Sequence, residues 1–382
     1  EKTNPTLRAA QDNIAESKAQ EVTAYLRPNP DFSASIDQID PFPQTPYRPL
    51  TSTLPLFSTS YLHERRNKRE LRLESAKKGT AIVSSQREDT ERNMLFTLRT
   101  AFVAALQAKA IRDVARENLD NYDKVLAVGR DRLRAGDIAQ VDMMRLDLQR
   151  VQYESDLQTA EVNVRTAKIQ LLQLLNDRTP VDGFDIAGKF DYSESPLELD
   201  GLRQMALNAR PDLRAAIQSI EKAKTDHQLA VANGSTDPTF SFDAGRQPPV
   251  PSYIGAGVTI PLRIFDRNQG EKERTEIEIR RSERLRDAAA AQVYSDVDSA
   301  FATINSSIAL LRSYKTKYLD EAMKVRDTIS FAYQHGGASL LDFLNAESDY
   351  RMTRLSYLNL VGSYLNAASQ LNLAVGQEVI TQ

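Results

Sequence analysis

The sequence contains no cysteine among its 382 residues, and this absence excludes disulfides, thiolate metal sites and cysteine nucleophiles. Its three histidines, His63, His227 and His335, are far apart in the chain, and nothing in the sequence suggests that they converge on a metal ion. A nucleophile–base pair, a phosphate-binding loop and metal-ligand spacings are also lacking. We therefore expect no metal site, no cofactor and no enzymatic activity.

Long apolar runs are lacking too. No stretch approaches the run of about 18 apolar residues that a membrane helix needs, so the chain is either soluble or crosses a bilayer as β-strands. The first residues, Glu1 to Pro5, lack the basic and apolar parts of a signal peptide, and we expect that any export signal has already been removed. The formal net charge is -3, which indicates no nucleic-acid partner.

The sequence repeats itself. Residues 136–174 align without gaps on residues 336–374, so that Asp142 corresponds to Asp342. In both copies apolar residues recur at alternating spacings of three and four, which is typical of a coiled-coil seam. The seam comprises Leu157, Ala160, Val164, Ala167, Leu171 and Leu174 in the first copy and Tyr357, Leu360, Tyr364, Ala367, Leu371 and Ala374 in the second.

Each half is predicted to contain the same elements: a helix of about 25 residues, two short strands, a helix of about 70 residues, a glycine turn and a helix of about 40 residues. At 1.5 Å per residue the long helix would span roughly 100 Å, and the two shorter helices together nearly match it, so four parallel rods are expected. The predicted boundaries are 1–176 for the first repeat (hairpin about 31–57, long helix 64–135, returning helix 138–176), 177–209 for a linker, 210–376 for the second repeat (hairpin 238–262, long helix 267–335, returning helix 338–376) and 377–382 for a C-terminal tail.

The second hairpin has the two-residue period of half-buried strands. One face of it is apolar, and the residues between are polar or small. At about nine or ten residues each, the strands match a tilted membrane strand. The residues predicted to face lipid are Phe240, Phe242, Ile254, Val258 and Ile260.

The first hairpin shows a weaker alternation. Phe32, Ala34 and Ile36 form one apolar face, and Leu54 and Leu56 are expected to continue the second strand. Four strands cannot close a barrel, and an open sheet edge is not tolerated in hydrocarbon. Two chains would give a barrel of eight strands, which side chains fill, whereas three would give twelve and an open lumen. We therefore expect a trimer.

At this point the sequence resembles a known family. Residues 261–270 are similar to the strand-to-helix exit of TolC-like outer-membrane efflux proteins, in particular those of the cobalt-zinc-cadmium resistance branch. Gly336, Leu340, Asp342 and Phe343 resemble the second tip of the family. Residues 31 to 60 depart from the usual pattern.

The resemblance implies a mainly α-helical protein with a small membrane β-barrel. Its barrel would have twelve strands, four from each chain of a homotrimer, and a long coiled-coil tunnel would continue it into the periplasm. The implied function is that of a passive outer-membrane exit duct for metal cations or drugs. The implied partners are outer-membrane lipid, a periplasmic adaptor and an inner-membrane pump, often of the resistance-nodulation-division type, and residues 177–209 would form part of a collar.

The resemblance also assigns the candidate site residues. The adaptor would dock at the two helical tips, while the gate in the lumen would involve Asp342, Asn345 and Tyr333. Three copies of Asp342 around a threefold axis would repel one another and raise the pKa of the carboxylates. Alternatively, Asp342 is an ordinary acidic residue in the first turn of a helix, where the helix dipole stabilises it. The tip residues are Gly136, Asp137, Ile138 and Val141 in the first half and Gly336, Gly337, Ala338 and Leu341 in the second.

An alternative function of the protein and two possible roles of a basic segment remain open. A soluble coiled-coil scaffold with dimerisation hairpins would explain the helices, but not two symmetric hairpins that each have an apolar face.

The basic run Arg65, Arg66, Lys68 and Arg69 is either a solvated helix face or a contact with lipid headgroups or anionic cargo.

Overall fold

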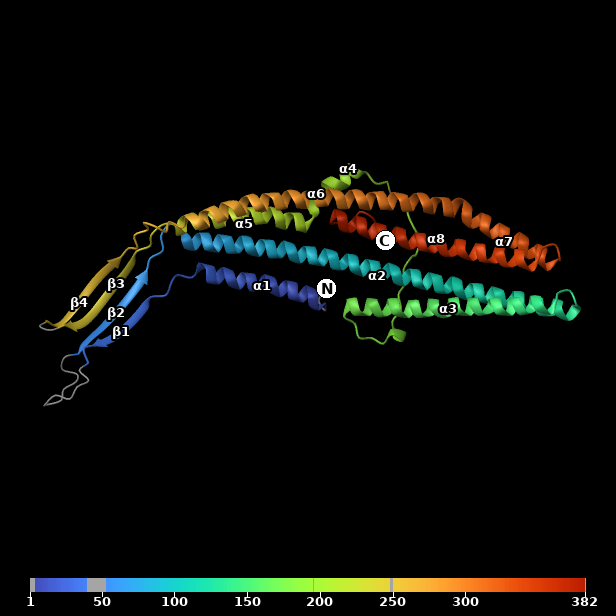
Figure 1. The fold of residues 1–382 in the computed structure, drawn as a ribbon, viewed down its shortest axis with the longest axis horizontal. Helices are drawn as coiled ribbons and strands as arrows, with labels where there is room; N and C mark the ends of the chain where they lie inside the picture. Colours follow the sequence, from blue (N-terminus) through green and yellow to red (C-terminus); the bar gives the residue numbers. More distant parts are fainter. Residues whose placement is uncertain (1–3, 40–52, 195, 248–249, 382) are drawn as a thin grey trace. The chain divides into compact units, whose positions relative to one another are not determined.

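The structure is a computed structural model that describes residues 4–39, 53–194, 196–247 and 250–381 (Figure 1). Within these ranges the protein is mainly helical and has one four-stranded sheet. In chain order the elements are α1 (Pro5–Tyr25), β1 (Asp31–Asp37), β2 (Leu54–Leu62), α2 (Lys68–Ala135), α3 (Gln140–Leu175), the 3-10 helix η1 (Val181–Gly183), α4 (Leu199–Ala209), α5 (Pro211–Asn233), β3 (Thr239–Gln247), β4 (Val250–Thr259), α6 (Gln269–Ser313), the π-helix η2 (Tyr314–Tyr318), α7 (Leu319–Gln334) and α8 (Leu340–Val375).

The chain divides into two compact units, and each unit contains parts of both sequence repeats. We call Glu1–Ala10, Arg87–Pro211 and Ala290–Gln382 the helical unit, and Gln11–Gln86 and Asp212–Ala289 the sheet unit. Helices α2 and α6 contribute residues to both units. The predicted repeats therefore describe the internal similarity of the sequence, but they are not the compact bodies of the structure.

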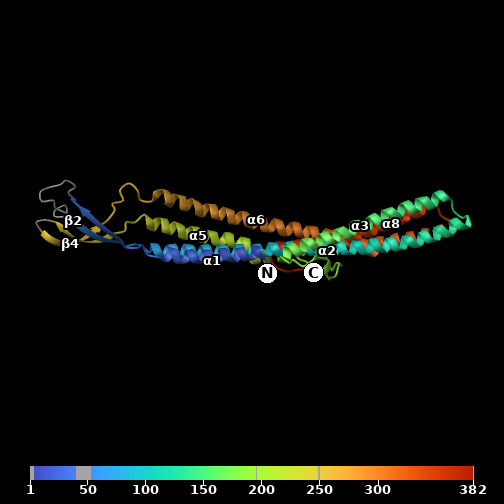
Figure 2. The same ribbon diagram turned by 90° about the horizontal axis from the view of Figure 1, so that it is seen from below.

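In the helical unit, buried apolar side chains follow the coiled-coil seam that the sequence predicts. Ala160, Val164 and Leu171 are buried on α3, and Tyr364 and Leu371 are buried on α8. Figures 1 and 2 show the α2–α3 turn and the α7–α8 turn at the same end of this unit. We call this end the tip.

The sheet unit contains all four strands, antiparallel and in the order β1-β2-β3-β4. In this register Phe240 lies opposite both Tyr61 and Val258, and Ala244 lies opposite both Phe57 and Ile254. Directly paired residues point to the same side of a sheet. One face is therefore apolar across the four strands, as the alternation predicts for the second hairpin.

The first hairpin has a register of β2 that the sequence does not reveal. Leu56 lies opposite Ser35 and Gly245, on the face that carries serine, glycine and aspartate. Phe57 occupies the apolar face instead. Leu54 and Leu56 lie in the second strand, as expected, but on its polar face, because the pairing with β1 and β3 sets the side to which each residue points. The strand also runs to Leu62, beyond the predicted end at residue 57, and residues 40–52 of this hairpin lie outside the described residues.

Both long helices begin after an asparagine in the left-handed region. Asn67 has a φ of 53° and Asn268 a φ of 61°, values that asparagine adopts more readily than most side chains. Each residue accepts the first helical hydrogen bond through its carbonyl, from Leu71 and Lys272 respectively. The helices therefore start slightly later than the predicted positions 64 and 267.

The second long helix runs from Gln269 to Gln334, close to the predicted residues 267–335, but it contains a π-helical turn. The π-helical turn η2 separates α6 from α7. Residues of the linker contact it, since Lys315 pairs with Asp191 at 3.7 Å and lies over the ring of Tyr192. A π-helical turn carries no composition marker, so the repeat pattern alone could not reveal it.

One described helix is apolar enough over part of its length to resemble a membrane span. Helix α2 contains an 18-residue window of mean hydropathy 1.3, of which 17% is buried. By composition alone, the statement that no stretch approaches a membrane helix is therefore too strong.

Candidate functional site

The tip is built from two glycine turns. Gly136 and Gly336 have φ values of 85° and 79°, which a residue with a Cβ rarely adopts. The backbone N–H groups of Asp137 and Gly337 donate to carbonyls of the preceding helices, at 2.9 and 2.7 Å. This geometry satisfies carbonyls that a helix end leaves unpaired. Both predicted glycine turns therefore act as helix C-caps.

The predicted tip residues are mostly accessible. Among them Leu341 is 66% and Val141 52% exposed, although both are apolar. Asp137 is exposed, whereas Ile138 and Ala338 are half-buried. In a single chain, the tip therefore exposes apolar side chains at its surface.

Asp342 and Ser339 form a reciprocal cap at the start of α8. The Ser339 Oγ accepts from the backbone N–H of Asp342 at 3.1 Å, and the Asp342 carboxylate accepts from the Ser339 backbone N–H at 3.2 Å and from its hydroxyl at 2.6 Å. These hydrogen bonds, first from the hydroxyl and then from the backbone, lower the pKa of Asp342. Repulsion among three copies would act in the opposite direction, and it remains a prediction for the assembly.

The first half lacks this cap. Ala139 stands at the helix N-cap of α3 and makes no side-chain hydrogen bond. Asp142 instead lies 3.8 Å from Arg145. The two corresponding carboxylates therefore make different contacts. Asp342 accepts hydrogen bonds from Ser339 at the start of its helix, whereas Asp142 forms a long ion pair with Arg145.

Tyr333 lies in the core and not at an open surface. It is 7% exposed, and its ring packs on Phe343 with the centroids 4.9 Å apart. Its hydroxyl is buried and has no hydrogen-bond partner among the described residues. The assignment of Tyr333 to the lumen is therefore corrected, because neighbouring helices of the same chain cover it. Asn345, in contrast, is exposed.

The predicted lipid-facing residues are all exposed on the apolar face of the sheet or at its edge. Their exposure runs from 49% for Phe240 to 76% for Ile254, with Phe242, Val258 and Ile260 between. Ile260 follows the last residue of β4. A contiguous apolar face of this kind on a single chain marks a surface that contacts a partner or a membrane.

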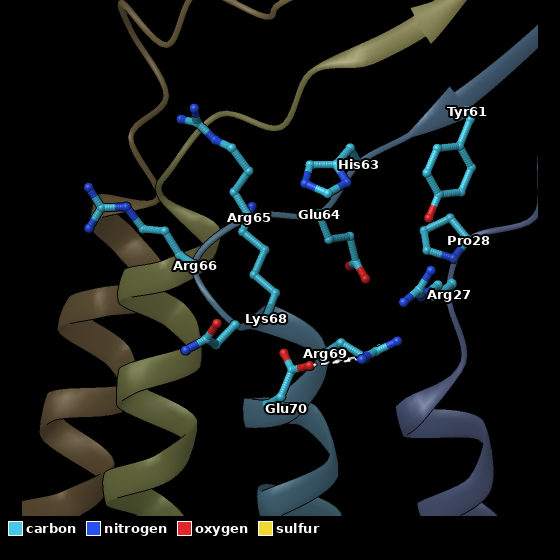
Figure 3. Close-up of a pocket in the computed structure, with 11 residues that line it drawn as sticks. Arg27, Pro28, Tyr61, His63, Glu64, Arg65, Arg66, Lys68, Arg69 and Glu70 are labelled. Carbon is cyan, nitrogen blue, oxygen red and sulfur yellow. Dashed lines mark hydrogen bonds and ion pairs between the residues drawn. The ribbon is translucent and has the colours of Figure 1, made fainter.

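A basic cleft lies where β2 joins α2 (Figure 3). We use this name for the cavity of about 390 Å³ lined by Tyr61, His63, Arg65, Arg66 and Arg27, together with their neighbours. The sequence singled out the run from Arg65 to Arg69. It missed Arg27, Tyr61 and His63, because nothing in the pattern of residues 31 to 60 indicates that the end of α1 returns to the end of β2.

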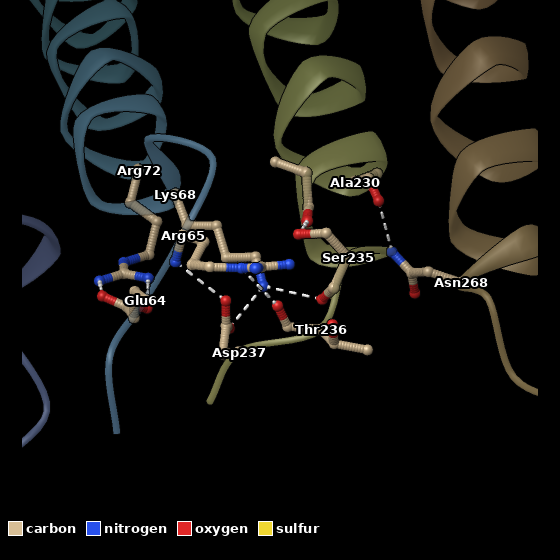
Figure 4. Close-up of polar contacts among 10 residues, drawn as sticks. Glu64, Arg65, Lys68, Arg72, Ala230, Ser235, Thr236, Asp237 and Asn268 are labelled. Carbon is tan, nitrogen blue, oxygen red and sulfur yellow. Dashed lines mark hydrogen bonds and ion pairs between the residues drawn. The ribbon is translucent and has the colours of Figure 1, made fainter. Parts of the chain in front are cut away.

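Two members of the basic run make contacts within the fold (Figure 4). Arg65 donates through Nε to the Thr236 carbonyl at 3.0 Å. Lys68 is 4% exposed and donates to Asp237 at 2.5 Å and to the Ser235 carbonyl at 3.1 Å. Burial disfavours the charged form of Asp237, but hydrogen bonds from Lys68 and from the Arg65 backbone lower its pKa overall. Lys68 therefore stabilises the junction between the strands and the helices.

Within the described ranges, no group of three or more His, Cys, Asp or Glu side chains could hold a metal ion. Two of the histidines have local hydrogen bonds: His227 with the Thr275 hydroxyl at 3.0 Å and His335 with the Phe331 carbonyl at 2.8 Å.

Comparison with known proteins gives consistent matches. The sequence profile described as "Outer membrane efflux protein" matches residues 202–377. The cobalt-zinc-cadmium resistance protein CzcC of Cupriavidus metallidurans is 23% identical, over 98% of this chain and 87% of that protein. The pyoverdine export outer membrane protein OpmQ of Pseudomonas aeruginosa is 24% identical, over 76% of this chain and 62% of that protein.

Solved structures share the fold. CusC superposes with a TM-score of 0.81 at 18% identity, over 98% of this chain and 89% of that chain. The outer membrane protein VceC of Vibrio cholerae also gives 0.81, at 15% identity, over 98% and 94%. Both matches include the coiled-coil helices and the sheet, since they cover nearly the whole chain.

The paired helices, the amphipathic sheet and these matches define an outer-membrane efflux channel. Residues 202–377 match the outer membrane efflux protein family, and over most of its length the chain is similar to CzcC and OpmQ. The function class and the location that the sequence resemblance implied are thereby confirmed, and the family is one of channels and not of enzymes. Outer membrane efflux proteins work with an adaptor and an inner-membrane pump.

Proposed function

We propose that this chain forms, as a homotrimer, the exit duct of a tripartite efflux system. Three copies of the sheet would close a twelve-stranded barrel in the outer membrane, and the helices would continue it as a tunnel through the periplasm. Cargo would pass by passive conduction from the pump and the adaptor to the exterior.

One observation carries the trimer: the sheet has two open edges and an apolar face. Among the described strands, β1 and β4 each have a single hydrogen-bonded neighbour. Unpaired backbone groups are costly in hydrocarbon, so a membrane sheet must close on itself. Eight strands would leave no lumen, whereas twelve would. Closure by three chains satisfies both requirements.

The tip residues are the proposed docking site of the adaptor. Val141 and Leu341 supply exposed apolar side chains, and the turns at Gly136 and Gly336–Gly337 expose backbone at the same end. A pump of the resistance-nodulation-division type is the proposed source of cargo, as the family resemblance implies. Heavy-metal cations or drugs are the proposed cargo, since CzcC is named for metal resistance.

The test is the assembly state of the purified protein. Extracted and kept in detergent, the protein should elute with the mass of three chains, as measured by light scattering. A stable monomer with intact strand content by circular dichroism would contradict the trimer. A protein that stays in solution without detergent would support the coiled-coil scaffold with dimerisation hairpins instead.

A further inference from the structure

The basic cleft holds cations that form no ion pair with a carboxylate of the described part of the chain. Its acidic residues are already engaged, because Glu64 pairs with Arg72 at 2.5 Å and Glu70 with Arg69 at 3.0 Å. Arg27, Arg65 and Arg66 form no ion pair with any described residue. All three are exposed. The cleft therefore carries a local excess of positive charge, in a chain whose net charge is slightly negative.

The backbone holds part of this cluster in an unusual conformation. Arg66 and Asn67 are consecutive non-glycine residues with φ values of 58° and 53°. Arginine rarely adopts this region, and such outliers cluster at functional sites. The following residue, Lys68, is fixed by its buried ion pair. Arg66 is thereby held on a turn that is anchored immediately after it.

The cleft is continuous with the apolar face of the sheet. Tyr61 lies opposite Phe240 on that face and also lines the cleft. The His63 ring contacts the Phe240 ring edge-on, with the centroids 6.4 Å apart. Figure 3 shows Tyr61 beside Arg27 and Pro28, on the side of α1. Along the sheet the surface thus changes from apolar residues to amphipathic rings and then to unpaired cations.

This order matches the layers of a membrane leaflet. Acyl chains favour the apolar face, aromatic residues with a polar edge favour the interface, and the phosphates lie just outside. The corresponding turn of the second half differs, since Leu262 and Phe265 there are 80% and 88% exposed. The second turn keeps a corresponding arginine, Arg267, but exposes large apolar side chains as well.

We propose that the basic cleft binds the phosphate group of a membrane phospholipid, with Arg27 and Arg66 as its principal donors and Arg65 beside them. The proposal rests on the proposed function, which places the apolar face of the sheet in the bilayer. Guanidinium groups suit this role because their forked donors match phosphate oxygens.

The test compares lipid retention by native mass spectrometry. The full-length protein in detergent is titrated with phosphatidylglycerol, with diacylglycerol, which lacks the phosphate, and with inorganic phosphate. The test variant is Arg27→Gln/Arg66→Gln, because neither side chain forms a hydrogen bond or ion pair with a residue that the structure describes. Arg27→Lys/Arg66→Lys keeps the charge. Arg284→Gln removes an exposed, unpaired arginine from α6 and is the matched control.

Each removed cation should weaken phosphatidylglycerol retention by about fivefold, with diacylglycerol retention unchanged. The lysine variant should retain most of the binding, and Arg284→Gln should retain all of it. Equal retention by the glutamine variant and the wild type would overturn the proposal, as would an equal loss in Arg284→Gln. Displacement of the lipid by millimolar inorganic phosphate would assign the site to a free anion and overturn the lipid. A protein that needs no detergent would instead refute the membrane location itself, and with it the proposed function.

Discussion

The rings of Tyr333 and Phe343 stack with their centroids 4.9 Å apart, which joins the last turn of α7 to the first turn of α8 across the glycine turn. Around this pair lie the buried side chains of Tyr122, Leu126 and Met143. The tip therefore has an aromatic core of its own, formed within one chain.

The first prediction concerns this core. Phe343 is 1% exposed, so Phe343→Ala should leave a cavity and cost about 3–5 kcal/mol. The measurement is hydrogen exchange of the backbone amides in α7 and α8. Leu341→Ala is the control and should change exchange little, because Leu341 is largely exposed. Similar effects of the two substitutions would contradict the packing described for the tip.

The second prediction is a pH dependence of the start of α8. The Ser339 cap lowers the pKa of Asp342 from the ordinary 3.8. Because the folded-state pKa is depressed, the cap stabilises the helix start fully above the ordinary pKa, and this stabilisation is lost as the pH falls through the lowered value. Ser339→Ala should therefore raise the pKa of Asp342 toward 3.8, as measured by the carboxyl chemical shift. An unchanged pKa would exclude the reciprocal cap. The start of α3 provides the comparison, because Ala139 offers no side-chain cap there.

The third prediction tests Asp342 as a gate residue. Three carboxylates close to a threefold axis would favour cations in a constriction. Asp342→Ala, recorded in a planar bilayer, should lower cation selectivity, whereas Asp142→Ala should change it less. If selectivity and conductance are unchanged in Asp342→Ala, the residue serves only to cap the start of α8 together with Ser339.

The fourth prediction concerns the apolar face of the sheet. Val258→Arg or Phe242→Arg should cost about 2–4 kcal/mol if the side chain lies near the bilayer midplane. Thr259→Ser, on the opposite face, should be tolerated. The readout is the fraction of heat-resistant trimer in outer-membrane extracts. Equal tolerance on both faces would indicate a hairpin exposed to water.

The sequence predicts regular elements well where one face is consistently buried. The seam through Val164 and Leu371 and the alternation at Phe240 and Phe242 both follow a fixed period, and the structure confirms them. Periodicity does not set the faces of β2, where Leu54 and Leu56 are apolar residues on the polar face. There the pairing with β1 and β3 decides the register, and local composition does not reveal it.

The candidate site was predictable only in part. The glycine residues predict the tip turns, and the basic run is evident in the sequence. The position of Tyr333 is not, because an aromatic residue near a tip can lie in a core as readily as in a lumen. The sequence carries a further signal: Arg66–Asn67 and Arg267–Asn268 are the same dipeptide at the start of both long helices. It identifies corresponding turns in the two halves, and it would have set the helix starts correctly.

The two unpaired edges of the sheet also bear on inheritance. In the proposed ring of three chains, β1 of each copy must meet β4 of the next, so every subunit completes two junctions. A subunit with a damaged edge would then disable the normal copies with which it assembles. Edge mutations in β1 or β4 should for this reason be dominant when a normal copy of the gene is expressed in the same cell, whereas substitutions that only prevent a chain from folding should be recessive.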